Sequence, residues 1–263
     1  MFNGFSICFS FCFFHVSRAE IDLPADTDPY AAEVYEAAAR NLKEFEAAGA
    51  LIRDSNPCFY VYRITVGDTS QTGIAVSASV QAYDENRIKK HELTRPSKED
   101  DRVRQIEAVN SITGPVLTVH RADRDLASLL ASATESSPDA EAHGIGGATH
   151  ELWVVSDTDT VEKIAQIMNG MEALYIADGH HRSAAGSRVA AARRAANPDH
   201  DGSEPYNGFL AVSFPDDEVT ILDYNRLVRD LNGEDAASFR AALADKFAIV
   251  AIDVPVRPAK PGT

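Results

Sequence analysis

The residues best suited to chemistry stand in one short run, Asp178 to Arg182, with the sequence Asp-Gly-His-His-Arg. The apolar residues 174–176 before it predict the end of a buried strand. The residues from Ser183 onward are rich in alanine and arginine, which predicts a helix that begins at or just after the run. A helix N-terminus that follows a tight turn leaves backbone N–H groups unpaired, and such groups attract anions. The run therefore predicts a phosphate site.

Each side chain of this turn suits a particular part of anion binding. Gly179 lets the backbone come close to a ligand, and Arg182 offers a planar guanidinium with five N–H donors. Ser183 can cap the helix or donate to an oxygen. Asp178 would repel a phosphate unless it holds Arg182, a magnesium ion or a substrate hydroxyl. We therefore assign Gly179, Arg182 and Ser183 to ligand binding, and Asp178 to a metal or a hydroxyl.

Two other interpretations of the turn stay open. His180 and His181 are neighbours, and neighbouring side chains do not face the same way from a regular helix or strand. A metal bound by both would need a loop and a third ligand. The candidates for that ligand are His150, His91 and Asp178. In the second interpretation Asp178 caps the turn and one histidine packs in the core.

A second stretch, residues 86–104, gathers basic and acidic side chains in a chain that is otherwise acidic. Such a charge run is often only the solvated face of a helix. Pro96 favours a helix start, however, so we expect residues 91–95 in a loop that leads into a helix N-terminus. Phosphate binding and proton transfer both need this mixture of charges. The site candidates in this stretch are Lys90, His91, Glu92 and Arg95.

The composition is that of a globular protein with an acidic surface. The 263 residues include 25 Lys and Arg against 40 Asp and Glu, which gives a formal net charge of -15. This balance argues against a broad nucleic-acid surface, which needs a basic face, but it leaves room for a small basic pocket. Cys8, Cys12 and Cys58 fit neither a disulfide framework nor a zinc site, so we expect a cytoplasmic protein.

The first residues are apolar from Phe5 to Phe14. This run has the length of a signal-peptide core, but no Lys or Arg precedes it. It is too short to span a membrane, and we expect no membrane association. We interpret residues 1–13 as an irregular or misassigned start, with a secretory leader as the alternative.

The patterns of the remaining chain predict a mixed α/β or α+β fold, with one mixed β-sheet and flanking helices. A strand, helix, strand and helix over residues 150–196 suggest a βαβ unit at its heart. We expect one domain over 14–254, a possible hairpin subdomain over 58–83 and a tail at 255–263. The expected strands are 58–66, 71–83, 116–120, 150–157, 207–215, 218–223 and one starting at 247. The expected helices are 31–48, one starting near 96, 123–135, 160–169, one starting near 183, and 236–246. In the last of these we expect Phe239 and Leu243 to face inward. Residues 136–147 are expected to form a loop.

Several longer runs resemble one known family. In chain order they are NPCFYVYR, QTGIAV, IKKHELTRPSKEDDR, HELWVVSD, LYIADGHHRSAA and ILDYNRLVRDLNG. Together they resemble the bacterial and archaeal family catalogued as domain of unknown function 1015, over about residues 14–247. Members of this family are usually longer at both ends. The resemblance therefore implies a shortened chain with exposed strand edges, for which we expect poor solubility.

The turn IADGHHR is also similar to the phosphate-binding turn of the ParB and sulfiredoxin superfamily, some members of which phosphorylate free serine. The similarity implies a ParB-like nucleotide-binding core in which Gly179, His180, His181 and Arg182 hold phosphate. It implies that Asp178 orients a metal or a hydroxyl. A carboxylate of the second stretch would take the hydroxyl proton, Glu92 first and Glu99 or Asp100 next.

The leading hypothesis from the sequence is a nucleotide-dependent phosphotransferase that uses ATP or ADP with magnesium. Its substrate would be serine or a related small hydroxy compound. Lys90, His91, Arg95 and Arg182 would bind the nucleotide, and transfer would depend on positioning and charge stabilisation. The alternatives are a nucleotide-sensing regulator without turnover and a metal-dependent hydrolase that uses His180, His181 and Asp178. The oligomeric state is left open.

Overall fold

The computed structural model describes residues 12–221 and 229–250, except for the side chain of Ile145. It divides into two compact units, one reaching to Val219 and one beginning at Thr220. In the second unit, helix α8 (Ala236–Ala244) is capped by Asp235, which accepts from the backbone N–H of Ser238 at 2.7 Å. Phe239 and Leu243 are half-buried there. All other elements below belong to the first unit.

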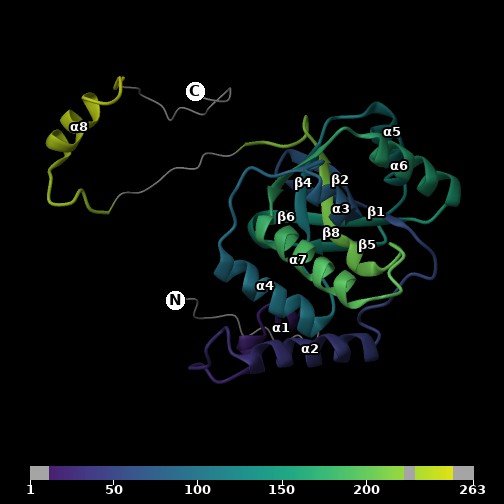
Figure 1. The fold of residues 1–263 in the computed structure, drawn as a ribbon. Coiled ribbons are helices and arrows are strands. Elements are labelled where there is room, and N and C mark those ends of the chain that lie inside the picture. The colour runs from purple at the N-terminus through teal and green to yellow at the C-terminus, as the bar shows by residue number, and fades with distance from the viewer. Residues whose placement is uncertain (1–11, 222–228, 251–263) are drawn as a thin grey trace. The chain divides into compact units, whose positions relative to one another are not determined.

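An eight-stranded mixed sheet forms the centre of the first unit (Figure 1). Strands β3 and β7 are parallel, as are β4 and β8, and the other neighbours are antiparallel. The predicted mixed sheet with flanking helices is thus confirmed. In spatial order the strands are β3 (Ile88–Lys89), β7 (Leu174–Asp178), β4 (Val116–His120), β8 (Gly208–Pro215), β2 (Thr69–Ser79), β1 (Phe59–Val66), β6 (Ala148–Val155) and β5 (Ala140–His143).

The helices follow from apolar side chains at helical spacing and from local caps. The α-helices are α1 (Phe14–Ser17), α2 (Ala32–Ala47), α3 (Val80–Asp84), α4 (Pro96–Val109), α5 (Arg124–Ala133), α6 (Thr158–Gly170) and α7 (His180–Ala196). Short 3-10 helices are η1 (Ala19–Asp22), η2 (Ile145–Gly147) and η3 (Pro205–Asn207). Helix α4 packs against α7, α2 against α4, and α1 against α2, as Figure 1 shows.

The two faces of the sheet differ in burial. Because successive side chains of a strand point to opposite faces, one set is enclosed and the other is not. Val61, Ile74 and Phe209 are at most 1% exposed and belong to the main core. Tyr175 and Leu210, from the alternate positions of β7 and β8, are 44% and 39% exposed. The main core therefore lies on one side of the sheet.

A second, smaller core holds the N-terminal helices to α4. It contains Val16 of α1, Val34, Ala38 and Phe45 of α2, and Val109 of α4. Tyr35 adds a buried hydrogen bond to Asp101 at 2.9 Å, which raises the pKa of Tyr35 to about 12 together with burial, the larger cause. Helix α4 is thereby fixed on one side by α2 and on the other by α7.

The structure corrects several predicted elements. Residues 80–83 form helix α3 instead of continuing β2, because Ser79 caps a helix by accepting from the N–H of Ala82 at 3.2 Å. The predicted loop 136–147 contains strand β5, which pairs with β6. Residues 218–221 and 247–250 carry no strand, and the other residues of those two predicted strands lie outside the described part.

Strand β6, helix α6 and strand β7 follow one another as predicted, but they do not form a compact βαβ unit. Strands β1, β2, β8 and β4 lie between β6 and β7 in the sheet. Most of the predicted N-terminal segment 1–13 lies outside the described residues. In the described part of the chain, no helix is both long enough and apolar enough to cross a bilayer.

Candidate functional site

The site is built at the junction of β7 and α7. Strand β7 ends at Asp178, and helix α7 begins at His180. Gly179 between them has a φ of 97°, in the left-handed region that favours glycine. No side chain in the described part of the chain caps this helix N-terminus. The positive end of the helix dipole and the first N–H groups of α7 therefore remain available for an anion.

Arg182 lies across this helix N-terminus. Its Nη2 donates to Oδ2 of Asp178 at 2.6 Å. A Cβ atom at Gly179 would come within 3.0 Å of Nε and Nη2, and one at Gly114 within 3.2 Å of Cδ, so the side chain runs closely over two glycines. Nε is buried and has no hydrogen-bond partner among the described residues. The guanidinium is thus held in place with part of its donor capacity unused.

The two histidines join α7 to the second charged stretch. His180 accepts a hydrogen bond at Nε2 from the backbone N–H of His91, at 3.4 Å. His181 accepts at Nε2 from the backbone N–H of Arg95, at 3.1 Å. Each imidazole therefore carries its proton on Nδ1 when neutral. The loop 91–95 is clamped beside the Asp-Gly-His-His-Arg turn, so the structure brings the two sequence motifs together.

His180 is the buried member of the pair, with 3% exposure. Burial, followed by the neighbouring His91, lowers the pKa of His180 below its ordinary value. The two rings meet edge to face, with centroids 4.5 Å apart. Nδ1 of His180 lies 3.7 Å from Oε2 of Glu92. At neutral pH a neutral imidazole therefore faces the Glu92 carboxylate, and that carboxylate is 59% exposed to solvent.

A cavity of about 440 Å³ opens in front of these groups. Four cationic side chains and two carboxylates line it, together with Gly179 and both histidines. Arg95 has no side-chain partner among the described residues. Lys98 donates to the Tyr30 hydroxyl at 3.0 Å, and Arg102 donates to Asp101 at 2.8 Å. The charged lining residues are Arg95, Lys98, Arg102, Arg182, Glu92 and Asp178.

Lys98 and Arg102 are lining residues that the sequence analysis did not select. They stand four residues apart in α4 and so share one face of that helix. The helix start at Pro96 carried this signal, because it fixes which residues of the charge run lie side by side. Their addition makes the cavity basic in a chain whose net charge is -15.

Other predicted residues have different neighbours. Lys90 donates to the backbone carbonyl of Tyr83 at 3.1 Å and lies over that ring, so it points away from the cavity. Ser183 is fully buried and donates to the carbonyl of His180 at 3.1 Å. Glu99 and Asp100 form ion pairs with Arg188 of α7, at 3.2 and 2.8 Å. None of these four residues lines the cavity, whereas Glu92 does.

The donors present can be compared with the needs of a metal and of a nucleotide. Among the described residues, no group of three His, Cys, Asp or Glu side chains is placed to hold a metal ion. Nε2 of both histidines is already an acceptor. The uncapped helix N-terminus, the unused donors of Arg182 and the cationic lining fit the phosphates of a nucleotide, and Asp178 offers a carboxylate for a magnesium ion.

Comparison with known proteins gave one match. The model of a family described as "Protein of unknown function (DUF1015)" matches residues 10–263. The searches of curated proteins and of solved structures each found no match.

Proposed function

Because the chain belongs to the DUF1015 family, whose description states no activity, we propose a function from the site itself. The protein is a nucleotide-dependent phosphotransferase that acts on a small hydroxy compound such as serine. The observation that supports this most is Arg182, held over Gly179 and Gly114 at the N-terminus of α7. Among the described residues, no side chain caps this helix end and none pairs with the buried Nε of Arg182. An anion with several acceptor oxygens would satisfy these donors.

Phosphate binding would draw on three groups of donors. The N–H groups at the start of α7 and the helix dipole favour negative charge at this point. Arg182 supplies a planar fork, and Arg95, Lys98 and Arg102 surround the same cavity. Several positive groups around one small space suit a di- or triphosphate better than a single carboxylate, because a polyphosphate presents more charge to the same donors.

Asp178 has a defined place in this arrangement. One of its oxygens, Oδ2, is tied to Arg182 at 2.6 Å, and its side chain is 73% exposed. The bond holds the guanidinium in position, and Oδ1 remains for a magnesium ion. Magnesium would neutralise part of the phosphate charge during transfer.

Glu92 is the residue we assign as the base. In the proposed reaction the substrate hydroxyl oxygen forms a bond to the γ-phosphorus of ATP, and the bond from that phosphorus to the β,γ-bridging oxygen breaks. The hydroxyl proton goes to Glu92, and ADP leaves with the electron pair of the broken bond. His180 positions Glu92 from 3.7 Å and stays neutral because burial lowers its pKa, so it does not cancel the charge of the carboxylate.

One observation favours a second candidate, a nucleotide-sensing protein without turnover. The loop 91–95 is joined to the anion site by the hydrogen bonds that His180 and His181 accept, at 3.4 and 3.1 Å. A phosphate that recruited either imidazole would release one end of this loop. Nucleotide binding would then be coupled to the position of α4, which follows directly at Pro96.

A turnover assay separates the two candidates. The protein is incubated with ATP, magnesium and, in separate reactions, serine and other small hydroxy compounds, and the phosphorylated product is measured by mass spectrometry. We expect Glu92→Gln to lower the rate about 100- to 10,000-fold, the usual contribution of a positioned base, while ATP affinity changes little. Glu107→Gln, which changes an exposed carboxylate of helix α4 outside the cavity, is the control and should keep the parent rate.

Two results would contradict the phosphotransferase. In the first, the parent binds ATP but phosphorylates no hydroxy compound, which would leave the sensing function. In the second, Glu92→Gln transfers phosphate at the rate of Glu107→Gln, which would remove Glu92 from the reaction.

A further inference from the structure

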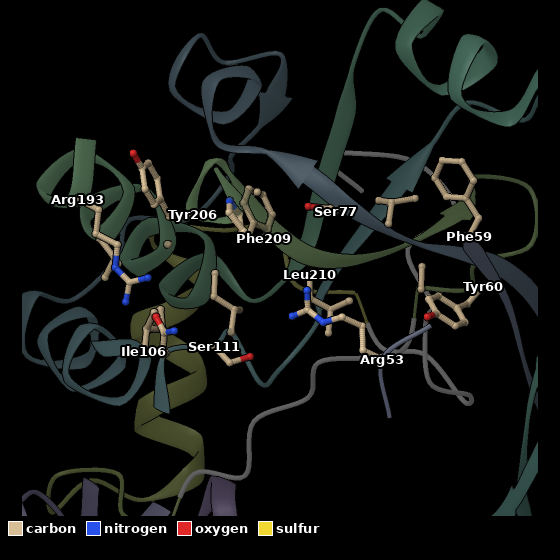
Figure 2. A pocket seen from close by; sticks show the side chains of 18 of the residues that line it. Arg53, Phe59, Tyr60, Ser77, Ile106, Ser111, Arg193, Tyr206, Phe209 and Leu210 are labelled. Carbon is tan, nitrogen blue, oxygen red and sulfur yellow. The ribbon is translucent and has the colours of Figure 1, made fainter. Parts of the chain in front are cut away.

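A second cavity, larger than the first, has no part in the proposed reaction. Its volume is about 790 Å³. It lies where β1 and β8 begin and β2 ends, beside the second half of α7 and the end of α4 (Figure 2). This volume is within the range of pockets that hold small organic ligands. The two cavities share no lining residue.

The charged side chains that line the second cavity are all basic. Arg53 and Arg193 line it, and its lining contains no Asp or Glu. Within the described ranges neither arginine forms an ion pair, although acidic residues outnumber basic ones by 40 to 25 in the whole chain. Arg193 is half-buried, so part of its hydration is already lost. Two unpaired guanidinium groups on one hollow favour an anionic ligand.

The rest of the wall is largely apolar and aromatic. Figure 2 shows Tyr206 near Arg193 at one end and Phe59 and Tyr60 at the other, with Arg53 between the two ends. The hydroxyl of Tyr60 is bonded to Asp54, and that of Tyr206 to Asn197 at 3.1 Å. Both tyrosines therefore offer their rings rather than their hydroxyls to the cavity. Such walls suit a flat apolar body.

Three uncharged polar side chains complete the lining. Ser77, Asn110 and Ser111 have no side-chain hydrogen bond to any described residue and lie on the cavity wall. Asn110 ends helix α4 with a φ of 52°, a left-handed conformation that places the next residues against the cavity. A mostly apolar pocket with a few convergent polar groups is the usual form of a ligand site.

We propose that this cavity binds an organic anion with an aromatic body, whose carboxylate or phosphate is held by Arg193 and Arg53. The aromatic part lies against Tyr206, the ring near Arg193. The proposal does not depend on the phosphotransferase, because the site at Arg182 contributes nothing to this wall.

The test compares each of two aromatic anions with an uncharged relative that has the same ring. Indole-3-acetate is compared with indole-3-acetamide, and phenyl phosphate with phenol, by calorimetric titration of the full chain. We expect at least one anion to bind and its neutral partner to bind at least about tenfold more weakly, the usual effect of losing a charge-assisted hydrogen bond.

Variants locate the binding. Arg193→Gln and Arg53→Gln should each weaken the anion about tenfold. Arg194→Gln, the next residue of the same helix and no part of the lining, should bind like the parent. Thermal unfolding and circular dichroism show that each variant is folded.

Three outcomes would overturn the proposal. The first is that neither anion binds the folded parent. The second is equal binding of the anions and their neutral partners. The third is that Arg193→Gln and Arg53→Gln both bind the anion as tightly as Arg194→Gln does.

Discussion

The two cavities lie along the two halves of helix α7, and they differ in how their arginines are held. In the first, Arg182 is bonded to Asp178 and runs over two glycines at the helix N-terminus. In the second, Arg193 stands in the last turn of the helix and has no ion pair among the described residues. The first cavity has carboxylates and imidazoles in its wall, whereas the second has aromatic rings and no carboxylate.

This difference shows how position on one helix selects the anion. At its N-terminus the helix dipole adds to the side chains, so a compact, highly charged phosphate is favoured. In the last turn of α7 the dipole disfavours an anion, so binding to Arg193 and Arg53 requires additional apolar contact. A fixed arginine with neighbouring acid and base groups suits a reaction. An unpaired arginine among rings suits binding alone.

The largest expected change in ligand affinity distinguishes the two cavities by their arginines. Arg182→Gln should weaken ATP binding about 100-fold, because a charged bidentate contact to phosphate contributes about 3 kcal/mol. Arg193→Gln should leave ATP affinity unchanged. Calorimetric titration with ATP and magnesium measures both. Equal losses of ATP affinity in the two variants would mean that one nucleotide site spans both cavities, against two separate sites.

Two glycines, Gly179 just before α7 and Gly186 within it, give the next effect. An alanine at Gly179 keeps a positive φ, which costs about 1–2 kcal/mol, and its Cβ would lie 3.0 Å from Arg182 Nε. We expect Gly179→Ala to lower the melting temperature by about 2–8 °C and to weaken ATP binding about tenfold. Thermal unfolding and calorimetry measure the two effects.

Gly186→Ala is the matched control for that prediction. A Cβ at Gly186 would lie 3.2 Å from the terminal Cδ1 of Ile112 and in ordinary contact, at 3.6 Å, with Cβ of Phe209. Alanine in a helix interior gains up to about 1 kcal/mol over glycine. Its melting temperature should not fall, and its ATP affinity should match the parent. If both glycine variants lost ATP binding equally, the effect would belong to α7 as a whole and not to its N-terminus.

The smallest expected effect concerns pH. Burial lowers the pKa of His180 in the first cavity, and the lining of the second cavity includes no histidine. Burial also lowers the pKa of His120, whose Nδ1 is hydrogen-bonded to the Ser213 hydroxyl at 2.8 Å. Near pH 6.5 the unfolded chain then binds more protons than the folded one, so the free energy of unfolding falls as the pH drops below about 6.5. Each histidine contributes at most about 1.4 kcal/mol per pH unit.

Urea unfolding between pH 5 and 8 measures this slope. His180→Gln and His120→Gln should each make it shallower, and His143→Gln, an exposed histidine, is the control. A slope that His180→Gln leaves unchanged would show that folding does not lower the pKa of His180, against the effect of burial assigned to it here.

The sequence allowed prediction of the features that local signals encode. The apolar run before Asp178, the glycine and the alanine-rich segment correctly predicted a strand, a turn and helix α7. Pro96 correctly predicted the start of α4 after a loop. Residues 80–83 continue the apolar pattern of β2, but the cap by Ser79 ends the strand, and a pattern of apolar residues does not contain that information.

The remaining features depend on contacts between distant residues. The hydrogen bonds from the 91–95 loop to His180 and His181 cross almost ninety residues of chain. The motif alone therefore suggested phosphate ligands, metal ligands or a core histidine, and not these bonds to the loop. Lys90 belongs to the same charge run as Arg95, yet its contact with Tyr83 directs it elsewhere. The second cavity draws its wall from several strands and helices, and no motif in the sequence marks it.

The most direct test of the phosphate site is a crystal structure of the full chain with magnesium and a non-hydrolysable ATP analogue. We predict that the phosphate oxygens lie within hydrogen-bonding distance of Arg182 and of the first N–H groups of α7. Phosphates bound between Arg53 and Arg193 instead, with the α7 N-terminus open to solvent, would contradict it.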